Sequence, residues 1–305
     1  MNELTQPGRL ARARATAYAK VTLSLRVLGR RGDGYHDIEA LVVSVGDPHD
    51  AVEVEAVPHP GGVSFLVEGE VVDVPTGPAN LAMRAGEAVM LRAGRSGHGV
   101  RMTLRKKIPA GAGLGGGSAD AAAAMEAVRR MLDLELSDAE MLEIGAEIGS
   151  DVPFCLTGGA AWIRGRGEQL EPVELPVGVP YLLAIPPFRL STPTVYAAWD
   201  ELGGPRSRRL VPGFGAVATL LPELSNDLEP AAEAVEPRLV EFREALERIV
   251  GVPALLAGSG STYVVPVPGD KVGRIDAVAK KVRRELRVSV ATSHTVSRGV
   301  RVNSA

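Results

Sequence analysis

A run of small residues from 111 to 118 is the segment of this chain best suited to hold phosphate, and it reads Gly-Ala-Gly-Leu-Gly-Gly-Gly-Ser. It follows an alternating stretch that ends at Pro109, and it precedes an alanine-rich stretch that begins at Ala119. Glycines let backbone N–H groups approach phosphate oxygens, and the N-terminus of a helix adds partial positive charge. The order of strand, glycine loop and helix therefore predicts a phosphate site.

The same loop fits other interpretations. Gly111-x-Gly113-x-x-Gly116 matches the dinucleotide fingerprint, with Asp133 or Glu135 near the expected acidic position. The preceding strand alternates apolar residues with arginine and threonine, which suits a mixed sheet better than a doubly wound domain. No Lys-Ser or Lys-Thr pair closes the loop, so the Walker pattern fails, and the protein-kinase motifs are absent. A hydride-transfer enzyme and a loop that only turns the chain stay open as alternatives here.

The elements around the loop can be read from hydrophobic periodicity and turn residues. Alternation predicts a half-buried strand over 16–27, a glycine turn follows over 29–36, and Ser137 with Glu140 forms a capping-box pattern. In this half we expect further strands at 38–45, 52–67 and 100–105, and helices at 81–94, 119–134 and 137–149. Asp151 is then expected on a loop at a helix end.

The later half begins with a proline-punctuated passage. A glycine hairpin at 165–168 leads into residues 172–187, which we interpret as the link to a second domain. The expected elements beyond it are helix-like segments at 228–249 and 271–286, with a glycine turn at 257–261 between strands. No repeat of fixed period is present, which argues against a solenoid or a propeller.

Composition narrows the class of protein. A chain of 305 residues with formal net charge -3 is long enough for two globular domains and lacks the basic surplus of a nucleic-acid binder. One cysteine, Cys155, excludes an internal disulfide framework and points to a reducing compartment such as the cytoplasm. No apolar run has the length of a membrane span or of a signal peptide core. We therefore expect no nucleic-acid partner and no membrane.

The segment from Pro109 to Ala122 resembles the nucleotide loop of the GHMP kinase superfamily. Further motifs, in the same order along the chain, resemble the 4-diphosphocytidyl-2-C-methyl-D-erythritol kinase family within it. They are Ala19-Lys20-Val21, Gly32-Asp33-Gly34-Tyr35-His36, Ala79-Asn80-Leu81, Gly149-Ser150-Asp151-Val152-Pro153-Phe154 and Asn226-Asp227-Leu228-Glu229-Pro230, while the late glycine turn Gly258-Ser259-Gly260-Ser261 belongs to the resemblance with the whole superfamily. The resemblance implies an α/β (α+β) fold of two domains. Residues 1–172 would carry a mixed sheet and the site, and residues 173–305 would place helices on an antiparallel sheet.

The resemblance also implies an activity and its residues. The family phosphorylates the 2-hydroxyl of its substrate with ATP and Mg²⁺, in the non-mevalonate route to isoprenoid precursors. Lys20 and Asp151 correspond to the catalytic pair, with Asp151 as the base and Lys20 offsetting charge on the phosphoryl group. No acidic cluster marks a dedicated metal site, so the ion is expected on the phosphates. The implied ATP-binding residues are Pro109, Ala110, Gly111, Ala112, Gly113, Leu114, Gly115, Gly116, Gly117, Ser118, Ala119 and Asn80.

The implied substrate carries a cytidine diphosphate group. In the family, residues at the positions of Tyr35 and His36 stack on and hydrogen-bond the cytosine, and Tyr196 stands where a second aromatic, usually phenylalanine, closes the other face. Thr22 replaces a usual asparagine two residues after the lysine, and a hydroxyl offers fewer hydrogen bonds than an amide. The alignment of the acceptor alcohol could therefore differ from that in the family.

Other interpretations stay open beside this one. The chain could be a GHMP kinase for another alcohol, such as homoserine or a mevalonate derivative, or a catalytically idle nucleotide-binding protein. Taken singly, Lys20 fits a solvated strand lysine and Asp151 fits a turn residue before proline. A monomer and a homodimer are equally compatible with the sequence.

Overall fold

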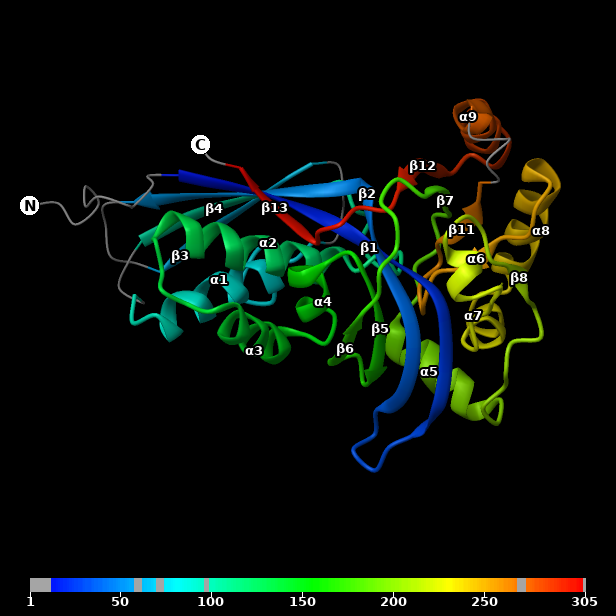
Figure 1. The fold of residues 1–305 in the computed structure, drawn as a ribbon, viewed down its shortest axis with the longest axis horizontal. Coiled ribbons are helices and arrows are strands. Elements are labelled where there is room, and N and C mark those ends of the chain that lie inside the picture. Colours follow the sequence, from blue (N-terminus) through cyan, green and yellow to red (C-terminus); the bar gives the residue numbers. More distant parts are fainter. Residues whose placement is uncertain (1–11, 58–61, 70–73, 96–98, 268–272, 304–305) are drawn as a thin grey trace, which may run out of the picture.

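Two sheets, one in each half of the chain, organise the computed structural model (Figure 1). The structure describes residues 12–57, 62–69, 74–95, 99–267 and 273–303. The larger sheet has seven strands, in the order β13-β1-β2-β4-β3, with β5 paired to β2 and β6 to β5. These strands are β1 (Arg12–Arg30), β2 (His36–Val57), β3 (Val63–Glu68), β4 (Gly99–Arg105), β5 (Ala160–Gly165), β6 (Gln169–Pro172) and β13 (Val300–Asn303).

The pairing in this sheet is mixed, as the resemblance implied. β3 runs parallel to β4, whereas β1 with β2, β2 with β4, β2 with β5 and β1 with β13 are antiparallel. The alternation seen in the sequence places Ala19, Val21 and Leu23 in the core. The helices of this half are α1 (Leu81–Arg92), α2 (Gly116–Met131), α3 (Asp138–Ile148) and α4 (Val152–Thr157).

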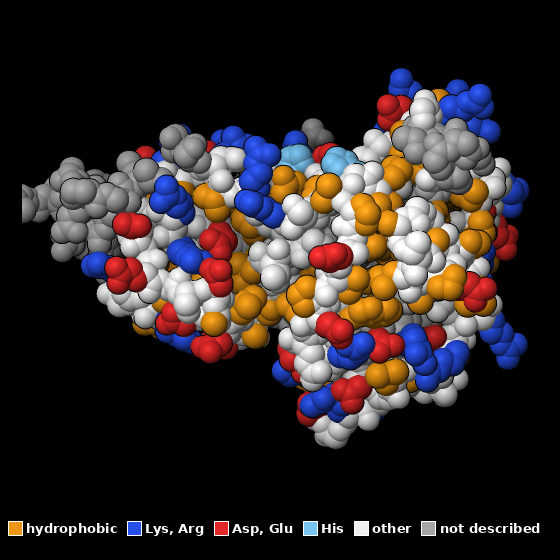
Figure 2. Space-filling view, in the orientation of Figure 1, with side chains coloured by type: hydrophobic (Ala, Val, Ile, Leu, Met, Phe, Trp, Pro, Cys, Tyr) orange, Lys and Arg blue, Asp and Glu red, His pale blue; other side chains and the backbone are white. Residues whose placement is uncertain are grey.

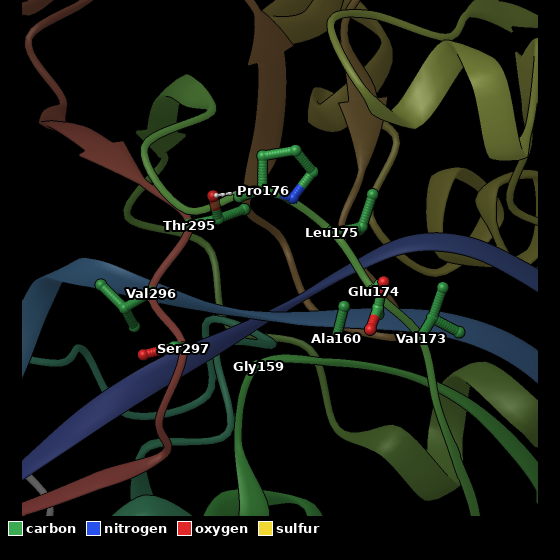
Figure 3. A pocket seen from close by; sticks show the side chains of 9 residues that line it. All are labelled: Gly159, Ala160, Val173, Glu174, Leu175, Pro176, Thr295, Val296 and Ser297. Carbon is green, nitrogen blue, oxygen red and sulfur yellow. Dashed lines mark hydrogen bonds between the residues drawn. The ribbon is translucent and has the colours of Figure 1, made fainter.

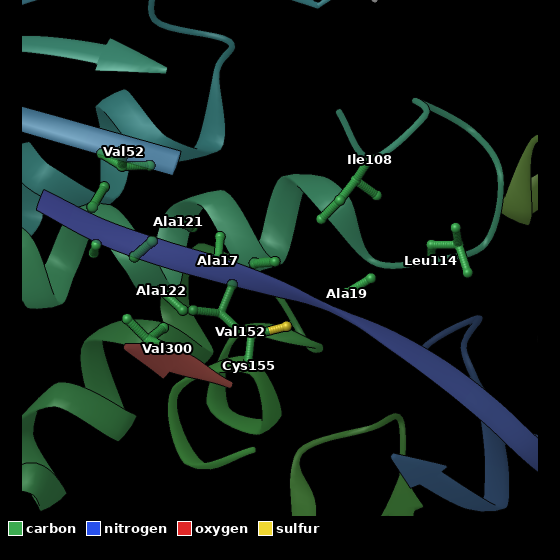
Figure 4. Packing of buried hydrophobic residues seen from close by; sticks show 14 of the residues in the cluster. Ala17, Ala19, Val52, Ile108, Leu114, Ala121, Ala122, Val152, Cys155 and Val300 are labelled. Atoms are coloured by element: carbon green, nitrogen blue, oxygen red, sulfur yellow. The ribbon is translucent and has the colours of Figure 1, made fainter. Parts of the chain in front are cut away.

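Helix α2 packs closely under β1. Its buried face is mostly alanine, and Figure 4 shows Ala121 and Ala122 close to Ala17, with Val152 and Cys155 of α4 beside them. Small side chains let the helix approach the sheet closely, so the start of α2 is held near the middle of β1.

The second half builds an antiparallel sheet covered by helices. The strand order is β10-β11-β7-β12, and every pair is antiparallel. Its strands are β7 (Pro180–Ile185), β10 (Leu255–Leu256), β11 (Tyr263–Pro266) and β12 (Ser289–His294), with a small pair β8 (Val211–Pro212) and β9 (Glu223–Leu224). The helices are α5 (Thr192–Glu201), α6 (Val217–Leu220), α7 (Glu229–Val235), α8 (Arg238–Val250) and α9 (Ile275–Leu286).

Several boundaries differ from the sequence prediction. Helix α2 begins at Gly116 rather than near Ala119, because Gly115 adopts a left-handed conformation and acts as the N-cap. The single helix expected over 228–249 is split into α7 and α8, and Pro237 stands at the break. The first part of the helix expected over 271–286 lies outside the described residues, and α9 begins at Ile275. The capping box at Ser137 and Glu140 is confirmed.

The last described strand returns to the first sheet. β13 pairs with β1 through Ala17 and Val300, whereas β12, the strand before it in sequence, pairs with β7 in the other sheet. The division between residues 172 and 173 stays a prediction, and the structure adds that β13 belongs to the sheet of the first half.

The surface carries charges of both signs. On the face seen in Figure 2, basic and acidic side chains are interspersed over both halves, with hydrophobic side chains between them. No helix in the described ranges is long and apolar enough to cross a membrane.

Candidate active site

Lys20 and Asp151, distant in sequence, lie side by side. Lys20 stands in the middle of β1, and its Nζ is 3.4 Å from Asp151 Oδ2. The lysine side chain is 14% exposed and the aspartate side chain 36%, so the pair is sheltered yet open to a ligand. Thr22, two residues along the same strand face, has its Oγ1 3.5 Å from Lys20 Nζ. The predicted catalytic pair and the unusual threonine therefore occupy one site.

Asp151 lies in the short connection between α3 and α4. It stands at the N-cap of α4, where its backbone oxygen accepts the Cys155 N–H at 3.1 Å, but its side chain makes no cap hydrogen bond. A carboxylate at this position often binds the first N–H groups of the helix. In this protein the Asp151 carboxylate pairs with Lys20 instead, and it remains available to a ligand bound beside the lysine.

The glycine loop lies directly against the lysine. The Lys20 N–H donates to the Leu114 oxygen at 3.0 Å, and a Cβ placed on Gly115 would be 2.6 Å from Lys20 Cγ. Gly111, Gly113 and Gly115 all have positive φ, between 66° and 82°, a conformation that favours glycine. The positive φ angles therefore favour glycine at all three positions, and at Gly115 the close approach of Lys20 requires it as well.

The start of α2 presents free donors at this loop. The bond from Ala119 N to Gly115 O is the first in the helix, so the N–H groups of Gly116, Gly117 and Ser118 have no intrahelical acceptor. The loop is anchored by Ile108 and Leu114, which are both buried members of the core cluster drawn in Figure 4. This arrangement can bind an anion such as a phosphate group.

The late glycine turn closes the site from the other half of the molecule. A Cβ on Gly260 would lie 2.3 Å from the Gly113 Cα, so the two glycine segments touch backbone to backbone. Gly258 faces Thr22, because a Cβ there would be 3.3 Å from Thr22 Oγ1. Asn226 holds this turn by donating from Nδ2 to the Gly258 oxygen at 2.7 Å. The resemblance pointed to the motif around Asn226, and the structure shows its buried amide supporting the turn.

The three predicted base-binding residues gather at the hairpin between β1 and β2. His36 stacks on Tyr196 of α5, with ring centroids 4.8 Å apart. Tyr35 is 57% exposed, and the Arg166 guanidinium lies 5.0 Å from the centre of its ring. Burial raises the pKa of the Tyr196 hydroxyl, and the nearby Asp151 charge raises it further. A contact of Tyr196 with a ligand stays a prediction.

Asp200 is a residue that sequence reasoning missed. Its Oδ1 is 2.9 Å from His36 Nε2, and its Oδ2 is 3.5 Å from the Arg30 guanidinium. Because an ionised carboxylate can only accept, His36 Nε2 carries the hydrogen. The position of Asp200 one helical turn after Tyr196 could have marked it, but the helix itself was not predicted.

Asn80 has a structural role at the start of α1. Its Oδ1 accepts the Ala82 N–H at 2.9 Å and its Nδ2 donates to the Pro75 oxygen at 2.8 Å. The next residue, Leu81, approaches the loop at Gly117. Asn80 therefore lies near the glycine loop, and its contact with ATP stays a prediction.

Two further features to examine are the reactivity of the Cys155 thiol and the presence of side chains that could bind a metal ion. Burial raises the pKa of the Cys155 thiol, and the Asp151 charge raises it further, so this thiol is a poor nucleophile. Among the described residues, no three histidine, cysteine, aspartate or glutamate side chains come together as a metal site.

A separate cavity is lined by other residues. It has a volume of about 580 Å³ and is lined by residues 173–176, 295–297, Gly159 and Ala160 (Figure 3). Its one charged lining side chain is Glu174, and none of the predicted site residues lines it. It lacks the paired acid and base of the Lys20 site and is not the candidate active site.

Comparisons with known proteins agree with this geometry. The family described as GHMP kinases N terminal domain matches residues 67–159. A 4-diphosphocytidyl-2-C-methyl-D-erythritol kinase of Pelotomaculum thermopropionicum is 41% identical over 253 residues, 81% of this chain and 86% of the relative. The enzyme of the same name from Cutibacterium acnes is 39% identical, covering 87% of this chain and 86% of the relative.

Solved structures give the same result. A crystal structure of 4-(cytidine 5'-diphospho)-2C-methyl-D-erythritol kinase superposes with a TM-score of 0.73 at 34% identity, covering 92% of this chain and 98% of that one. A homoserine kinase from Cytophaga hutchinsonii, at 18% identity and a TM-score of 0.66, shares the fold and covers 96% of this chain and 98% of that one. With a mixed sheet, a glycine loop at a helix start and relatives above 30% identity over most of their length, this chain belongs to the 4-diphosphocytidyl-2-C-methyl-D-erythritol kinase family of GHMP kinases.

Proposed function

We propose that this protein transfers the terminal phosphoryl group of ATP to the 2-hydroxyl of 4-diphosphocytidyl-2-C-methyl-D-erythritol. The products are the 2-phosphate and ADP, and the step serves the non-mevalonate route to isoprenoid precursors. The observation that carries the proposal is the distance of 3.4 Å between Lys20 Nζ and Asp151 Oδ2, beside the loop of free N–H groups. The names of the relatives support the choice of substrate.

In this proposal the glycine loop binds the triphosphate. The N–H groups of residues 116–118 point along the start of α2, where the helix dipole favours negative charge. Phosphoryl transfer depends mainly on positioning and on neutralising charge, so a rigid loop of backbone donors is suited to it. Mg²⁺ would enter with ATP, be held by phosphate oxygens, and offset charge on the group that moves.

Asp151 acts as the base. It accepts the proton of the 2-hydroxyl as that oxygen bonds to the γ-phosphorus, and the bond from phosphorus to the ADP oxygen breaks. Lys20, whose Nζ lies 3.4 Å from that carboxylate, stabilises negative charge on the moving group. Thr22, bonded to Lys20, replaces the asparagine expected from the family and contributes one hydroxyl toward the acceptor alcohol.

The cytosine ring would lie at the β1–β2 hairpin. Tyr35 and Tyr196 offer aromatic faces, and His36 offers a ring nitrogen for hydrogen bonding. A flat base bound there would direct the erythritol end toward Asp151, whose charge already acts on Tyr196. We further propose a cytoplasmic location, which the single buried cysteine supports.

The test is an assay of ADP release from purified protein. Wild type should release ADP with the cytidylylated erythritol and not with homoserine. Asp151→Asn removes the base, and we expect a loss in kcat of roughly 10²- to 10⁴-fold with little change in the KM for ATP. Lys20→Met should also lower kcat, because it removes the charge beside the carboxylate.

Matched controls are available on exposed helices of the second half. Glu244→Gln on α8 and Lys280→Met on α9 make the same chemical changes at exposed positions, and we expect wild-type rates from both. ADP release with homoserine alone would favour another GHMP kinase activity. Release with neither alcohol would favour an idle nucleotide-binding protein.

A further inference from the structure

Three charged side chains are buried beneath the glycine loop. Asp50 of β2 is 0% exposed, Lys106 just after β4 is 5% exposed, and Asp120 of α2 is 2% exposed. Charged residues are almost never buried this deeply unless they are paired. None of the three takes part in the chemistry proposed above, so their burial needs another explanation.

Lys106 joins the two carboxylates. Its Nζ donates to Asp50 Oδ2 and lies 2.8 Å from Asp120 Oδ2. Asp50 Oδ1 in turn accepts the Ile108 N–H at 2.8 Å. The cluster therefore connects β2, the segment that enters the glycine loop, and the helix that leaves it.

The cluster also contacts the first residue of α2. A Cβ placed on Gly116 would lie 2.8 Å from Lys106 Nζ and 2.9 Å from Ile108 Cγ2. The N-cap of this helix, Gly115, has no side chain to hold the helix end. The N-terminus of α2 is therefore supported by the ion pairs of Lys106 and not by a capping side chain.

Both ends of the loop are consequently fixed to one point. The entry is held by Asp50 through the Ile108 N–H, and the exit is held by Lys106 through Asp120 and the contact with Gly116. A loop rich in glycine has many accessible conformations, and ordering it costs conformational entropy. Anchored ends remove most of that freedom before any ligand binds.

We propose that Asp50, Lys106 and Asp120 are positioning residues that hold the glycine loop in its phosphate-binding shape. They act through the N–H groups of residues 116–118 and do not touch the nucleotide themselves. The inference rests on the proposed function only in that the loop binds the phosphates of ATP or ADP. Asp120 contacts Lys106 through Oδ2, and its Oδ1 has no hydrogen-bond partner within the described residues.

The variants separate geometry from charge. Asp120→Ala removes the acceptor for Lys106, whereas Asp120→Asn keeps one oxygen in place and removes only the charge. Burial raises the pKa of Asp120 above its ordinary value, and the nearby Lys106 charge opposes that shift. Lys106→Met removes the ammonium, and Lys107→Met is the matched control, because the Lys107 side chain is exposed.

ADP affinity measured by titration calorimetry, with no alcohol present, is the main readout. We expect Asp120→Ala and Lys106→Met to weaken ADP binding on the order of ten-fold or more, as small misplacements of a binding group do. Asp120→Asn and Lys107→Met should stay within about two-fold of wild type. In turnover, the KM for ATP should rise while the KM for the alcohol stays constant, and amide hydrogen exchange should quicken over residues 109–118.

Wild-type ADP affinity in folded Asp120→Ala and Lys106→Met would overturn the inference. An equal rise in both KM values would also overturn it, because general loosening would then explain the loss. If Lys106→Met does not fold, the comparison of Asp120→Ala with Asp120→Asn decides. A wild type that binds ADP but does not phosphorylate the cytidylylated alcohol would refute the proposed acceptor, and the ratio of ADP affinities would still settle the role of the three residues.

Discussion

At the scale of single residues, the backbone of Asp151 starts helix α4, while its side chain belongs to the candidate active site. Its oxygen accepts the first bond of α4, while its carboxylate makes no cap and lies 3.4 Å from Lys20. Pro153 within the first turn needs no N–H acceptor, which lowers the demand for a capping side chain. Local sequence thus leaves a carboxylate available at a fixed position.

Asp200 provides a prediction at the same scale. Its carboxylate accepts the hydrogen on His36 Nε2 and so fixes the orientation of the imidazole ring that is predicted to hydrogen-bond the cytosine. We expect Asp200→Ala to raise the KM for the cytidylylated substrate about ten-fold, as loss of a charge-assisted hydrogen bond does. The KM for ATP should not change. Steady-state kinetics with each substrate varied in turn provides the measurement.

The nearby Glu201→Gln, on an exposed position of the same helix, is the control for this variant. The imidazole nitrogen shifts of His36 in an NMR spectrum report its tautomer without any assay. A wild-type spectrum with the hydrogen on Nδ1 would contradict this role for Asp200, whatever the kinetics.

At the scale of elements, α2 starts where its own sequence is least helical. Gly116 and Gly117 disfavour helix by about 1 kcal/mol each relative to alanine, yet both lie inside it. Tertiary contacts from Lys106 and Ile108 override that preference. The alanine run after Ala119 was readable from the sequence, but contacts from other elements set the first turn.

The contact between the two glycine turns provides a prediction for the element scale. A Cβ on Gly260 would overlap Gly113, so Gly260→Ala must push the turn away from the loop. We expect a destabilisation of about 1–3 kcal/mol, as overpacking produces, together with weaker ATP binding. Urea unfolding and ADP titration measure the two effects.

Gly273→Ala serves as the comparison for this variant, because a Cβ at that glycine has no neighbour within 4 Å. It should leave both stability and ADP binding near wild type. If Gly260→Ala behaved like Gly273→Ala, the contact between the turns would have no energetic weight.

At the scale of the whole molecule, the sequence predicts individual helices and strands better than the tertiary contacts between them. Alternation indicated the strand around Lys20, and short residue patterns indicated the capping box at Ser137 and the glycine loop, because each signal is local. The pairing of Asp50 with Lys106 joins residues 56 positions apart, and no local pattern reports it. Helix α5, which carries Tyr196 and Asp200, was missed because its short apolar pattern follows a proline-rich passage. The catalytic pair was assigned by resemblance, and its closeness became visible only in the fold.

The return of β13 leads to a prediction for the whole molecule. A fragment of residues 1–172 would leave the β1 edge unpaired where Ala17 and Thr16 now face Val300 and Arg301. Unpaired edges promote association, so the fragment should form oligomers or aggregates in size-exclusion chromatography. Addition of residues 295–303 through a flexible linker should restore a monodisperse species more than a scrambled segment of the same length. A well-behaved fragment without that segment would contradict the expectation.

The route of the chain also orders events during synthesis. β1 leaves the ribosome early, but its neighbour β13 follows only after every strand and helix of the second half has been made. Domains commonly fold as they emerge. In this protein the β1 edge of the first sheet stays unpaired until β13 has been synthesised. A chaperone that binds exposed strand edges would therefore have the longest time to bind the first half of the protein.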